Sequence, residues 1–187
     1  GDGDGGGGSG GSGTSGRVVI SRKQKLRWLR GIAAGVAHLH ANNIIHRDIA
    51  SRNVLLELIA DEPPLTNAVI TDFGMSRTRT ECGVGGEATS DVERSQKTTD
   101  TIGPVRWMAA EQIRTHSYST KSDVWAFACV CYEVLVRRVP YYEHTDAHVA
   151  HLLLSGTTLQ LRAEQCDDGF CPAAVAQLCR RCWRQEA

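Results

Sequence analysis

The stretch that decides the fold is Ile45-His-Arg-Asp48-Ile-Ala-Ser-Arg-Asn53-Val-Leu-Leu56, continued after a break by Ala68-Val-Ile-Thr-Asp72-Phe-Gly74. Aliphatic and β-branched residues at 54–57 and 68–71 predict two short strands, and the segment between them is rich in turn-forming Pro, Asp and Asn. One polar loop enters this hairpin with Asp48 and Asn53, and another leaves it with Asp72. We therefore expect the three oxygen-bearing side chains to lie at the same edge of the hairpin.

Two carboxylates and an amide can place a hard cation beside a base. Mg²⁺ prefers oxygen ligands and shares its shell with waters and substrate phosphates. The stretch resembles the catalytic loop and the Asp-Phe-Gly element of eukaryotic protein kinases, because His46-Arg-Asp48 is followed at the family's spacing by Asn53 and then by Asp72-Phe-Gly74. The resemblance implies an enzyme that uses ATP and Mg²⁺ to phosphorylate a protein substrate.

The resemblance also implies a role for each matching residue. Asp48 would accept or orient the proton of the attacking hydroxyl, while Asn53 and Asp72 would hold Mg²⁺ against the phosphates. Most catalysis of phosphoryl transfer is positioning and charge neutralisation, so the geometry of these groups matters more than any shifted pKa.

Neighbouring residues take supporting roles in the same resemblance. Arg47 would receive an activation-segment phosphate, because a guanidinium pairs with phosphate through two hydrogen bonds, or it would pair with a local carboxylate. Arg52 joins the catalytic residues, and Leu55 joins the nucleotide-contacting ones. The residues expected to act by packing or anchoring are His46, Phe73, Gly74, Glu111 and Asp123.

Helical patterns surround this stretch. Apolar residues recur at spacings of three and four over 22–42, and residues 124–136 are apolar on nearly every helical face, which predicts a buried central helix. Thr120 and Asp123 resemble a capping box at its start, and residues 146–155 suggest a further helix. This order is that of the large, C-terminal lobe of a kinase. We expect an α+β, mainly α, protein-kinase-like fold.

The domain organisation follows from the same comparison. Residues 17–187 are expected to be a C-terminal-lobe fragment, with the catalytic loop at 46–53, the Mg²⁺-binding motif at 72–74 and the activation segment at 72–111. Residues 1–16 are almost all Gly, Ser, Asp and Thr, which predicts a flexible linker. Its glycines formally match a phosphate-covering loop, but no strand lysine follows. We therefore expect the N-terminal lobe to be missing from this chain and to act as its upstream partner.

Two markers favour tyrosine as the phosphorylated residue. Serine/threonine kinases usually carry a lysine two residues after the catalytic Asp, whereas this chain has Ala50 there and Arg52 nearby. They also usually carry a threonine seven residues before Glu111, where this chain has Pro104, whose flat apolar ring suits a phenol. In the tyrosine-kinase form of this motif, Pro104 and Trp107 are expected to contact the substrate.

One observation points the other way. No tyrosine occurs from 75 to 108, so the candidates for regulatory phosphorylation are Thr98, Thr99 and Thr101. A serine/threonine kinase of the tyrosine-kinase-like group is therefore the alternative. A catalytically silent kinase-fold interaction module is a third hypothesis, because an N-terminal lobe would supply half of the ATP site.

The charge, apolar stretches and cysteines of the chain bear on its cellular location and its binding partners. The 21 basic residues balance the 21 acidic ones, so net charge favours no nucleic-acid partner. The longest apolar stretch, 124–136, is too short to span a bilayer. The seven cysteines are odd in number and scattered, which suits a reducing compartment, and we expect a cytoplasmic location. Membrane tethering through upstream sequence stays open.

Two groups of side chains suggest metal sites as alternatives. A zinc site could draw on a Cys-x-x-Cys pair and two further cysteines, although buried or surface thiols explain the pattern more simply. Three histidines fall on one helical face, which a solvated surface explains equally well. The cysteines are Cys166, Cys171, Cys179 and Cys182, and the histidines are His144, His148 and His151.

Overall fold

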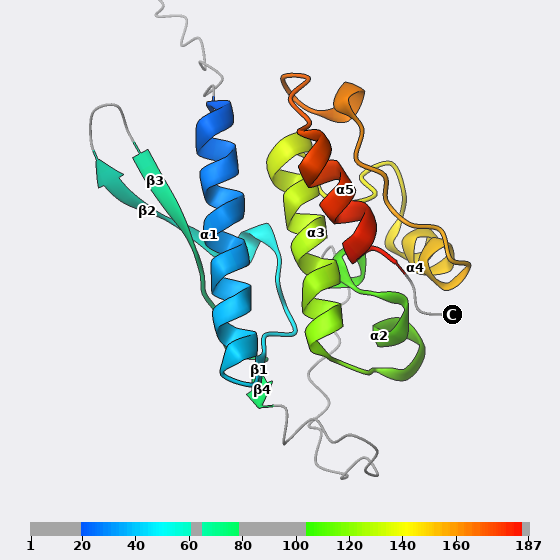
Figure 1. The fold of residues 1–187 in the computed structure, drawn as a ribbon. Coiled ribbons are helices and arrows are strands. Elements are labelled where there is room, and N and C mark those ends of the chain that lie inside the picture. Colours follow the sequence, from blue (N-terminus) through cyan, green and yellow to red (C-terminus); the bar gives the residue numbers. More distant parts are fainter. Residues whose placement is uncertain (1–19, 61–64, 79–103, 185–187) are drawn as a thin grey trace, which may run out of the picture.

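The computed structural model describes residues 20–60, 65–78 and 104–184, so the expected linker at 1–16 lies outside the described residues. The described residues form a mainly helical unit with two small antiparallel sheets, and the α+β, mainly α class is confirmed. Figure 1 shows α1 and α3 side by side, with the β2–β3 hairpin against α1 and α5 against α3. The helices are α1 (Arg22–Ala41), α2 (Ala110–Thr115), α3 (Thr120–Val136), α4 (Asp146–Leu154) and α5 (Ala173–Cys182). The strands are β1 (Ile44–Ile45), β2 (Val54–Ala60), β3 (Leu65–Ile70) and β4 (Arg77–Thr78), and the 3₁₀ turns are η1 (Ser51–Asn53), η2 (Pro104–Trp107) and η3 (Ala163–Gln165).

Helix α1 lies between the hairpin and the central helix. Ser21 caps its first turn by accepting a hydrogen bond from the backbone amide of Gln24 at 3.1 Å. The helix approaches β3 so closely that a Cβ at position 31 would lie 2.7 Å from the carbonyl oxygen of Ala68. Gly31 therefore allows the contact between α1 and the hairpin. The residues that α1 buries at helical spacing include Leu29, Ile32, Val36 and Leu39.

The hairpin is longer than the sequence predicted, and its outer part is held by α1. Strands β2 and β3 pair from Val54 opposite Ile70 outward, with an irregularity between Leu58 and Ala60. From α1, the indole of Trp28 donates to the hydroxyl of Thr66 at 2.8 Å. A second sheet pairs β1 with β4. Since β1 precedes the catalytic loop and β4 follows Gly74, this sheet fixes both ends of the functional stretch.

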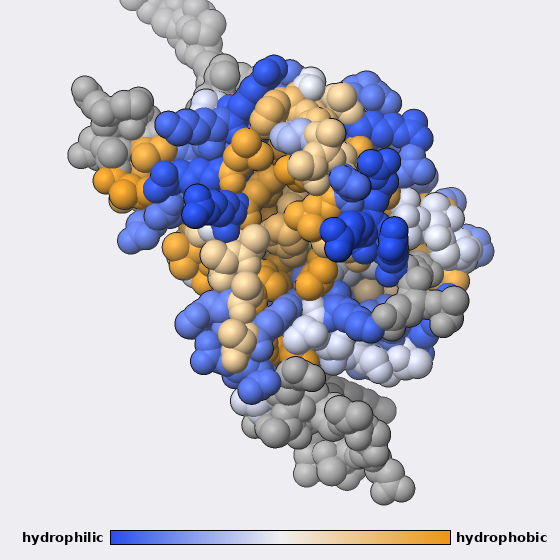
Figure 2. Space-filling model, viewed as in Figure 1, coloured by the Kyte–Doolittle hydropathy of each residue, from blue (hydrophilic) through white to orange (hydrophobic). Residues whose placement is uncertain are grey.

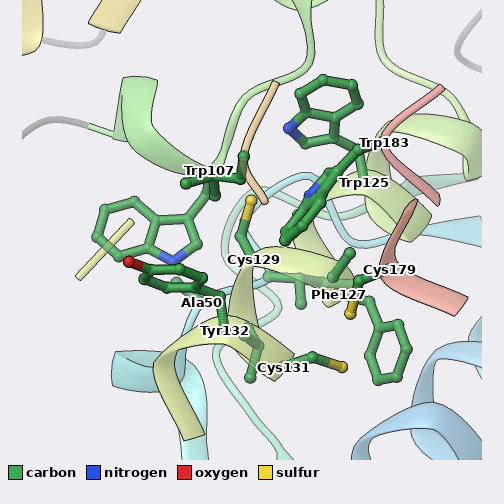
Figure 3. Close-up of a cluster of buried hydrophobic side chains, with 14 of the residues drawn as sticks. Ala50, Trp107, Trp125, Phe127, Cys129, Cys131, Tyr132, Cys179 and Trp183 are labelled. Atoms are coloured by element: carbon green, nitrogen blue, oxygen red, sulfur yellow. The ribbon is translucent and has the colours of Figure 1, made fainter. Parts of the chain in front are cut away.

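Helix α3 forms the centre of the core, as predicted for 124–136. Figure 3 shows aromatic rings and thiols gathered around it, including Trp107 and the α5 residue Cys179. The predicted capping box at Thr120 and Asp123 is wrong by one residue. Ser119 is the N-cap, its hydroxyl accepts from the backbone amide of Ser122 at 3.3 Å, and the Ser122 hydroxyl accepts from the Ser119 amide at 2.9 Å. Asp123 is buried and takes no part in the cap. Its carboxylate can therefore accept hydrogen bonds from another part of the chain.

Apolar side chains remain uncovered on one face. Figure 2 shows apolar side chains gathered between α1 and α5. The exposed large apolar residues of these two helices include Leu26 and Leu178. Within the described ranges, every helix is too short or too polar to cross a bilayer.

The zinc alternative is wrong for the residues that the structure describes, since none of their His, Cys, Asp and Glu side chains gather in a group of three that could hold a metal ion. The four cysteines instead divide between two places. The thiol of Cys179 contacts that of Cys131 on α3, with Cys182 nearby, whereas the thiol of Cys166 contacts that of Cys171. The exposed rings of His144 and His148 stack with centroids 4.6 Å apart, and the ring of His151 meets that of His148 edge-on.

The segment 166–171, which we call the clasp loop, joins three helices. Its Asp168 carboxylate lies 3.2 Å from the ammonium of Lys25, an α1 side chain that is only 1% exposed. Its Phe170 ring lies 5.0 Å below the guanidinium of Arg22, also on α1. The adjoining Asp167 pairs with Arg137 at the end of α3, at 3.2 Å. The clasp loop therefore holds the start of α1 against the end of α3, and the chain continues from it into α5.

Asp168→Asn is expected to lower the free energy of unfolding by about 1–3 kcal/mol at pH 7, because the buried Lys25 ammonium loses its counter-charge. Burial alone would raise the pKa of Asp168, but hydrogen bonds from the Phe170 amide and Lys25 outweigh it and hold the pKa below its usual range. A carboxylate with a lowered folded pKa stabilises the fold above its unfolded pKa, and this contribution disappears as the pH falls through the folded value. Urea unfolding at pH 7 and pH 3 should therefore show a difference between wild type and variant that shrinks in acid.

Two variants control this experiment. Glu164→Gln removes an exposed carboxylate of η3 and should change stability little. Lys25→Met in the Asp168→Asn background removes the unpaired buried charge and should restore stability. Equal stability of wild type and Asp168→Asn at pH 7 would contradict the assigned role of the ion pair.

Candidate active site

The base of the hairpin brings the two predicted metal-binding residues to the same edge. Asn53 ends η1 immediately before β2, and Thr71 follows β3. The amide and the hydroxyl of Thr71 both donate to the carbonyl oxygen of Asn53, at 2.9 and 3.3 Å. Asp72 is the next residue, and its backbone φ of 61° lies in the left-handed region, which turns the chain out of the strand. Asn53 and Asp72 thus lie at the same end of the strand pair, one beside each strand.

Asn53 also fixes Asp48. Its amide nitrogen donates to the Asp48 carbonyl oxygen at 2.7 Å and to the Asp48 carboxylate at 2.8 Å. Because the amide nitrogen uses both of its hydrogens here, the amide oxygen faces the opposite way. The Asp48 side chain is 20% exposed, so its carboxylate is held by the loop and still meets solvent.

The backbone of the catalytic loop is anchored from α3. The buried carboxylate of Asp123 accepts hydrogen bonds from the backbone amides of His46 and Arg47, both at 2.9 Å. The same carboxylate lies 2.9 Å from Nε2 of His40, at the end of α1. Charge-assisted hydrogen bonds of this kind are stronger than neutral ones. Asp123 therefore ties α1 and the start of the catalytic loop to the central helix.

His46 and Phe73 pack against each other, with ring centroids 5.4 Å apart. His46 is fully buried and contacts both loops. Its Nδ1 accepts a hydrogen bond from the Asp48 amide at 3.3 Å, and its Nε2 lies 3.1 Å from the Thr71 carbonyl oxygen. On the leaving loop, the Gly74 amide donates to the Asp72 carboxylate at 3.2 Å. These contacts hold the entering and leaving loops together.

Arg52 lies directly beside the candidate base. Its guanidinium forms an ion pair with the Asp48 carboxylate and stacks on the ring of Trp107, 4.8 Å from the centroid. Trp107 is buried, and its indole nitrogen donates to the carboxylate of Glu133 at 2.8 Å. A chain of contacts therefore runs from α3 through the 3₁₀ turn η2 to Asp48.

Glu133 was not identified as a site residue from the sequence. Its carboxylate accepts from the amide and the hydroxyl of Ser51, at 3.1 and 2.6 Å, as well as from Trp107. Burial raises the pKa of Glu133, and the hydrogen bonds from Ser51 and Trp107 oppose that rise. The sequence signal that could have identified Glu133 is that it is the single acid in the otherwise apolar stretch 124–136. A carboxylate in such surroundings needs hydrogen-bond donors, and Ser51 and Trp107 supply them.

Arg106 is a second residue that sequence reasoning missed. Its buried guanidinium donates to the carbonyl oxygens of Pro140, Tyr141 and His144, at 3.0, 2.7 and 2.6 Å. It also lies 2.7 Å from the carboxylate of Asp146 at the start of α4. Arg106 therefore fixes η2 to the segment between α3 and α4.

The donor set fits Mg²⁺ as part of a larger coordination shell. Asn53 offers an amide oxygen, and Asp72 offers an exposed carboxylate with one oxygen bonded to Gly74. Mg²⁺ is commonly held by one or two protein oxygens, with waters and phosphates completing its octahedron. A site of this type does not need three ionisable side chains, which agrees with the described residues forming no such cluster.

The other residues predicted for the site are spread over several elements of the fold. The guanidinium of Arg47 lies 4.9 Å above the ring of Tyr118. Leu55 is 60% exposed on β2, and Glu111 is exposed in the first turn of α2, where it lines a hollow together with Arg181 and Arg184. Pro104 opens η2, three residues before Trp107. The regulatory candidates Thr98, Thr99 and Thr101 lie outside the described residues.

Comparisons of the sequence with known proteins show what the chain is similar to. The family model described as "Protein tyrosine and serine/threonine kinase" matches residues 15–187. The chain is 32% identical over 166 residues to the human ephrin type-A receptor 5 and to the chicken ephrin type-A receptor 7, in each case over 87% of this chain. It is 28% identical over 167 residues, or 89% of the chain, to the RGS domain-containing serine/threonine-protein kinase A of Dictyostelium discoideum. The chain spans 12–14% of the length of these relatives.

Proposed function

Because the chain belongs to the protein tyrosine and serine/threonine kinase family, we propose that it transfers the γ-phosphate of ATP to tyrosine side chains of protein substrates. The observation that carries this proposal is the held carboxylate of Asp48, bonded to Asn53 and paired with Arg52. A base in a kinase must meet the substrate hydroxyl at a fixed position, and these two contacts restrict the Asp48 side chain to one orientation.

In this mechanism, Asp48 orients the substrate hydroxyl and accepts its proton as the oxygen attacks the γ-phosphate. Asn53 holds the carboxylate from one side through its amide nitrogen. Arg52 holds it from the other side and is itself supported by the ring of Trp107. The loop therefore supplies an oriented base without reorganisation during the reaction.

Asn53 and Asp72 are the residues that would hold Mg²⁺, through one amide oxygen and one carboxylate. The ion supplies neutralisation of phosphate charge when it is bound. Leu55, exposed on β2 near this edge, presents an apolar side chain suited to a nucleotide base. We propose that an N-terminal lobe covers the same face of the hairpin.

Tyrosine is favoured over serine and threonine by the surroundings of Asp48. Ala50 is fully buried and carries no side chain that could reach a phosphate, so the nearby cation on the loop is Arg52. In the kinase family, this replacement of lysine and the proline at 104 are the tyrosine-type choices. The 32% identity to ephrin receptors supports this assignment, and the Dictyostelium serine/threonine-protein kinase supports the alternative.

A peptide assay separates the alternatives. The protein expressed from its complete reading frame is given labelled ATP and Mg²⁺ with one of two peptides. The first peptide has tyrosine as its only acceptor, and the second offers only serine and threonine. We expect label on the tyrosine peptide alone, and its loss in the Asp48→Asn variant. Label on the second peptide would support the serine/threonine alternative, and label on neither would support a silent interaction module.

A further inference from the structure

Two thiols of the clasp loop are neighbours. The thiols of Cys166 and Cys171 are near enough to interact electrostatically, and the Cys166 thiol donates to the carbonyl oxygen of Arg162 at 3.4 Å. Gly169 lies between them with a φ of +66°, and its amide donates to the Cys166 carbonyl oxygen at 3.1 Å. This turn, whose left-handed residue is a glycine and therefore unstrained, reverses the chain between Cys166 and Cys171.

The two thiols differ in their access to solvent. Cys166 is buried, whereas Cys171 is partly exposed. Burial and the neighbouring Cys171 sulfur raise the pKa of Cys166 to about 12, so Cys166 stays a thiol at neutral pH. A small oxidant can therefore reach Cys171 first, with a second sulfur already in contact.

A second pair of interacting thiols provides a comparison within the same molecule. Cys131 of α3 and Cys179 of α5 are also in contact, but their residues are only 1% and 0% exposed. Figure 3 shows both among the aromatic side chains of the core. Because an oxidant cannot reach these buried thiols, we expect the pair to stay reduced while the protein is folded.

We propose that Cys166 and Cys171 form an oxidation site, at which hydrogen peroxide closes an intramolecular disulfide across the clasp loop. The bridge fixes the turn that carries Asp167 and Asp168. Those carboxylates hold Arg137 and the buried Lys25, so the bridge stabilises the junction of α1 and α3. The oxidised and reduced forms differ in how firmly α1 is held, and α1 leads directly into the catalytic loop.

The reaction balances in two steps. The Cys171 thiolate attacks a peroxide oxygen, a sulfur–oxygen bond forms as the oxygen–oxygen bond breaks, and the departing hydroxide takes a proton to become water. The Cys166 sulfur then attacks the sulfenic sulfur of Cys171. A sulfur–sulfur bond forms, the sulfur–oxygen bond breaks, and the departing hydroxide takes the Cys166 proton as a second water. Two thiols lose two electrons, and one peroxide gains them.

The test treats the folded protein with hydrogen peroxide, blocks the remaining thiols by alkylation, and maps the disulfides by mass spectrometry. Trypsin alone leaves Cys166, Cys171 and Cys179 in one peptide, so cleavage after Phe170 is added to separate the first two. We expect a disulfide-linked peptide pair containing Cys166 and Cys171, with Cys131 and Cys179 alkylated only after unfolding. The Tm should rise by about 3–6 °C, as expected for a short closed loop, and return after reduction with dithiothreitol.

Single variants test the order of the steps. In Cys166→Ser, Cys171 should accumulate as a sulfenic acid that dimedone traps, whereas Cys171→Ser should give no trapped product at Cys166. Cys182→Ser is the matched control, because Cys182 is also partly exposed but lies on α5. Its Tm should still rise on oxidation. Absence of the 166–171 link, a link from Cys171 to another cysteine, or an unchanged Tm would overturn the proposal.

Discussion

Asp48→Asn is expected to lower kcat for peptide phosphorylation by about 10²–10⁴-fold, the usual contribution of a general base. The amide keeps an oxygen that can accept from Asn53, so the loop should retain its shape. It cannot accept the substrate proton, and it loses the ion pair with Arg52. Steady-state kinetics on the protein expressed from its complete reading frame should show the loss in kcat, with KM for ATP little changed.

The matched control for this result is Glu164→Gln, which makes the same chemical change at an exposed position on η3, remote from Asp48 in the chain. Its kcat should equal that of the wild type. A kcat for Asp48→Asn within about threefold of the wild type would contradict the role of Asp48, because even a weak general base contributes more.

Asp123→Asn is expected to lower the free energy of unfolding by about 3–4 kcal/mol, because a buried charged acceptor with three partners is lost. If the amide oxygen replaces the carboxylate oxygen that faces His40 and the His46 amide, the new amide nitrogen faces the backbone N–H of Arg47. Two donors then oppose each other in a buried place. Thermal unfolding should show a Tm lower by roughly 10 °C, and hydrogen exchange should report faster opening of the catalytic loop.

Asp72→Asn serves as the comparison for stability. Asp72 is exposed and accepts only a local hydrogen bond from Gly74 among those assigned, so its replacement should change the Tm little. A similar Tm for Asp123→Asn and the wild type would show that the three contacts of Asp123 do not hold the loop.

The hairpin and its two loops could be predicted because the relevant pattern is local. Strand-forming runs separated by turn residues bring Asn53 and Asp72 to one edge, and the contact between Thr71 and Asn53 is the direct consequence. Helices α1 and α3 were predictable for the same reason, since their apolar spacing is visible within a few turns. The capping error at Thr120 was small, because Ser119 and Thr120 are both able to cap and only the backbone selects one.

The partners of buried polar groups could not be predicted in this way. Glu133 contacts residues that lie 82 and 26 positions away, and no local pattern encodes such a distance. Arg106 likewise binds carbonyl oxygens 34 to 38 residues away, and a carbonyl has no sequence signature. The zinc alternative failed for a related reason. Cys166 and Cys171 are close in sequence to Cys179 and Cys182, but α5 carries the second pair to the core beside Cys131.

The position of Glu133 has an evolutionary consequence. One carboxylate serves both Ser51 and Trp107, so the effect of a substitution at any of these three positions depends on the residues at the other two. Replacing Glu133 leaves the indole N–H of the buried Trp107 and the hydroxyl of Ser51 without their acceptor, whereas changing all three residues together removes both side-chain donors with the acceptor. Epistasis should therefore link the three sites. Sequences related to this chain should change them as a set, and a variant library should recover functional triples whose single steps are unfit.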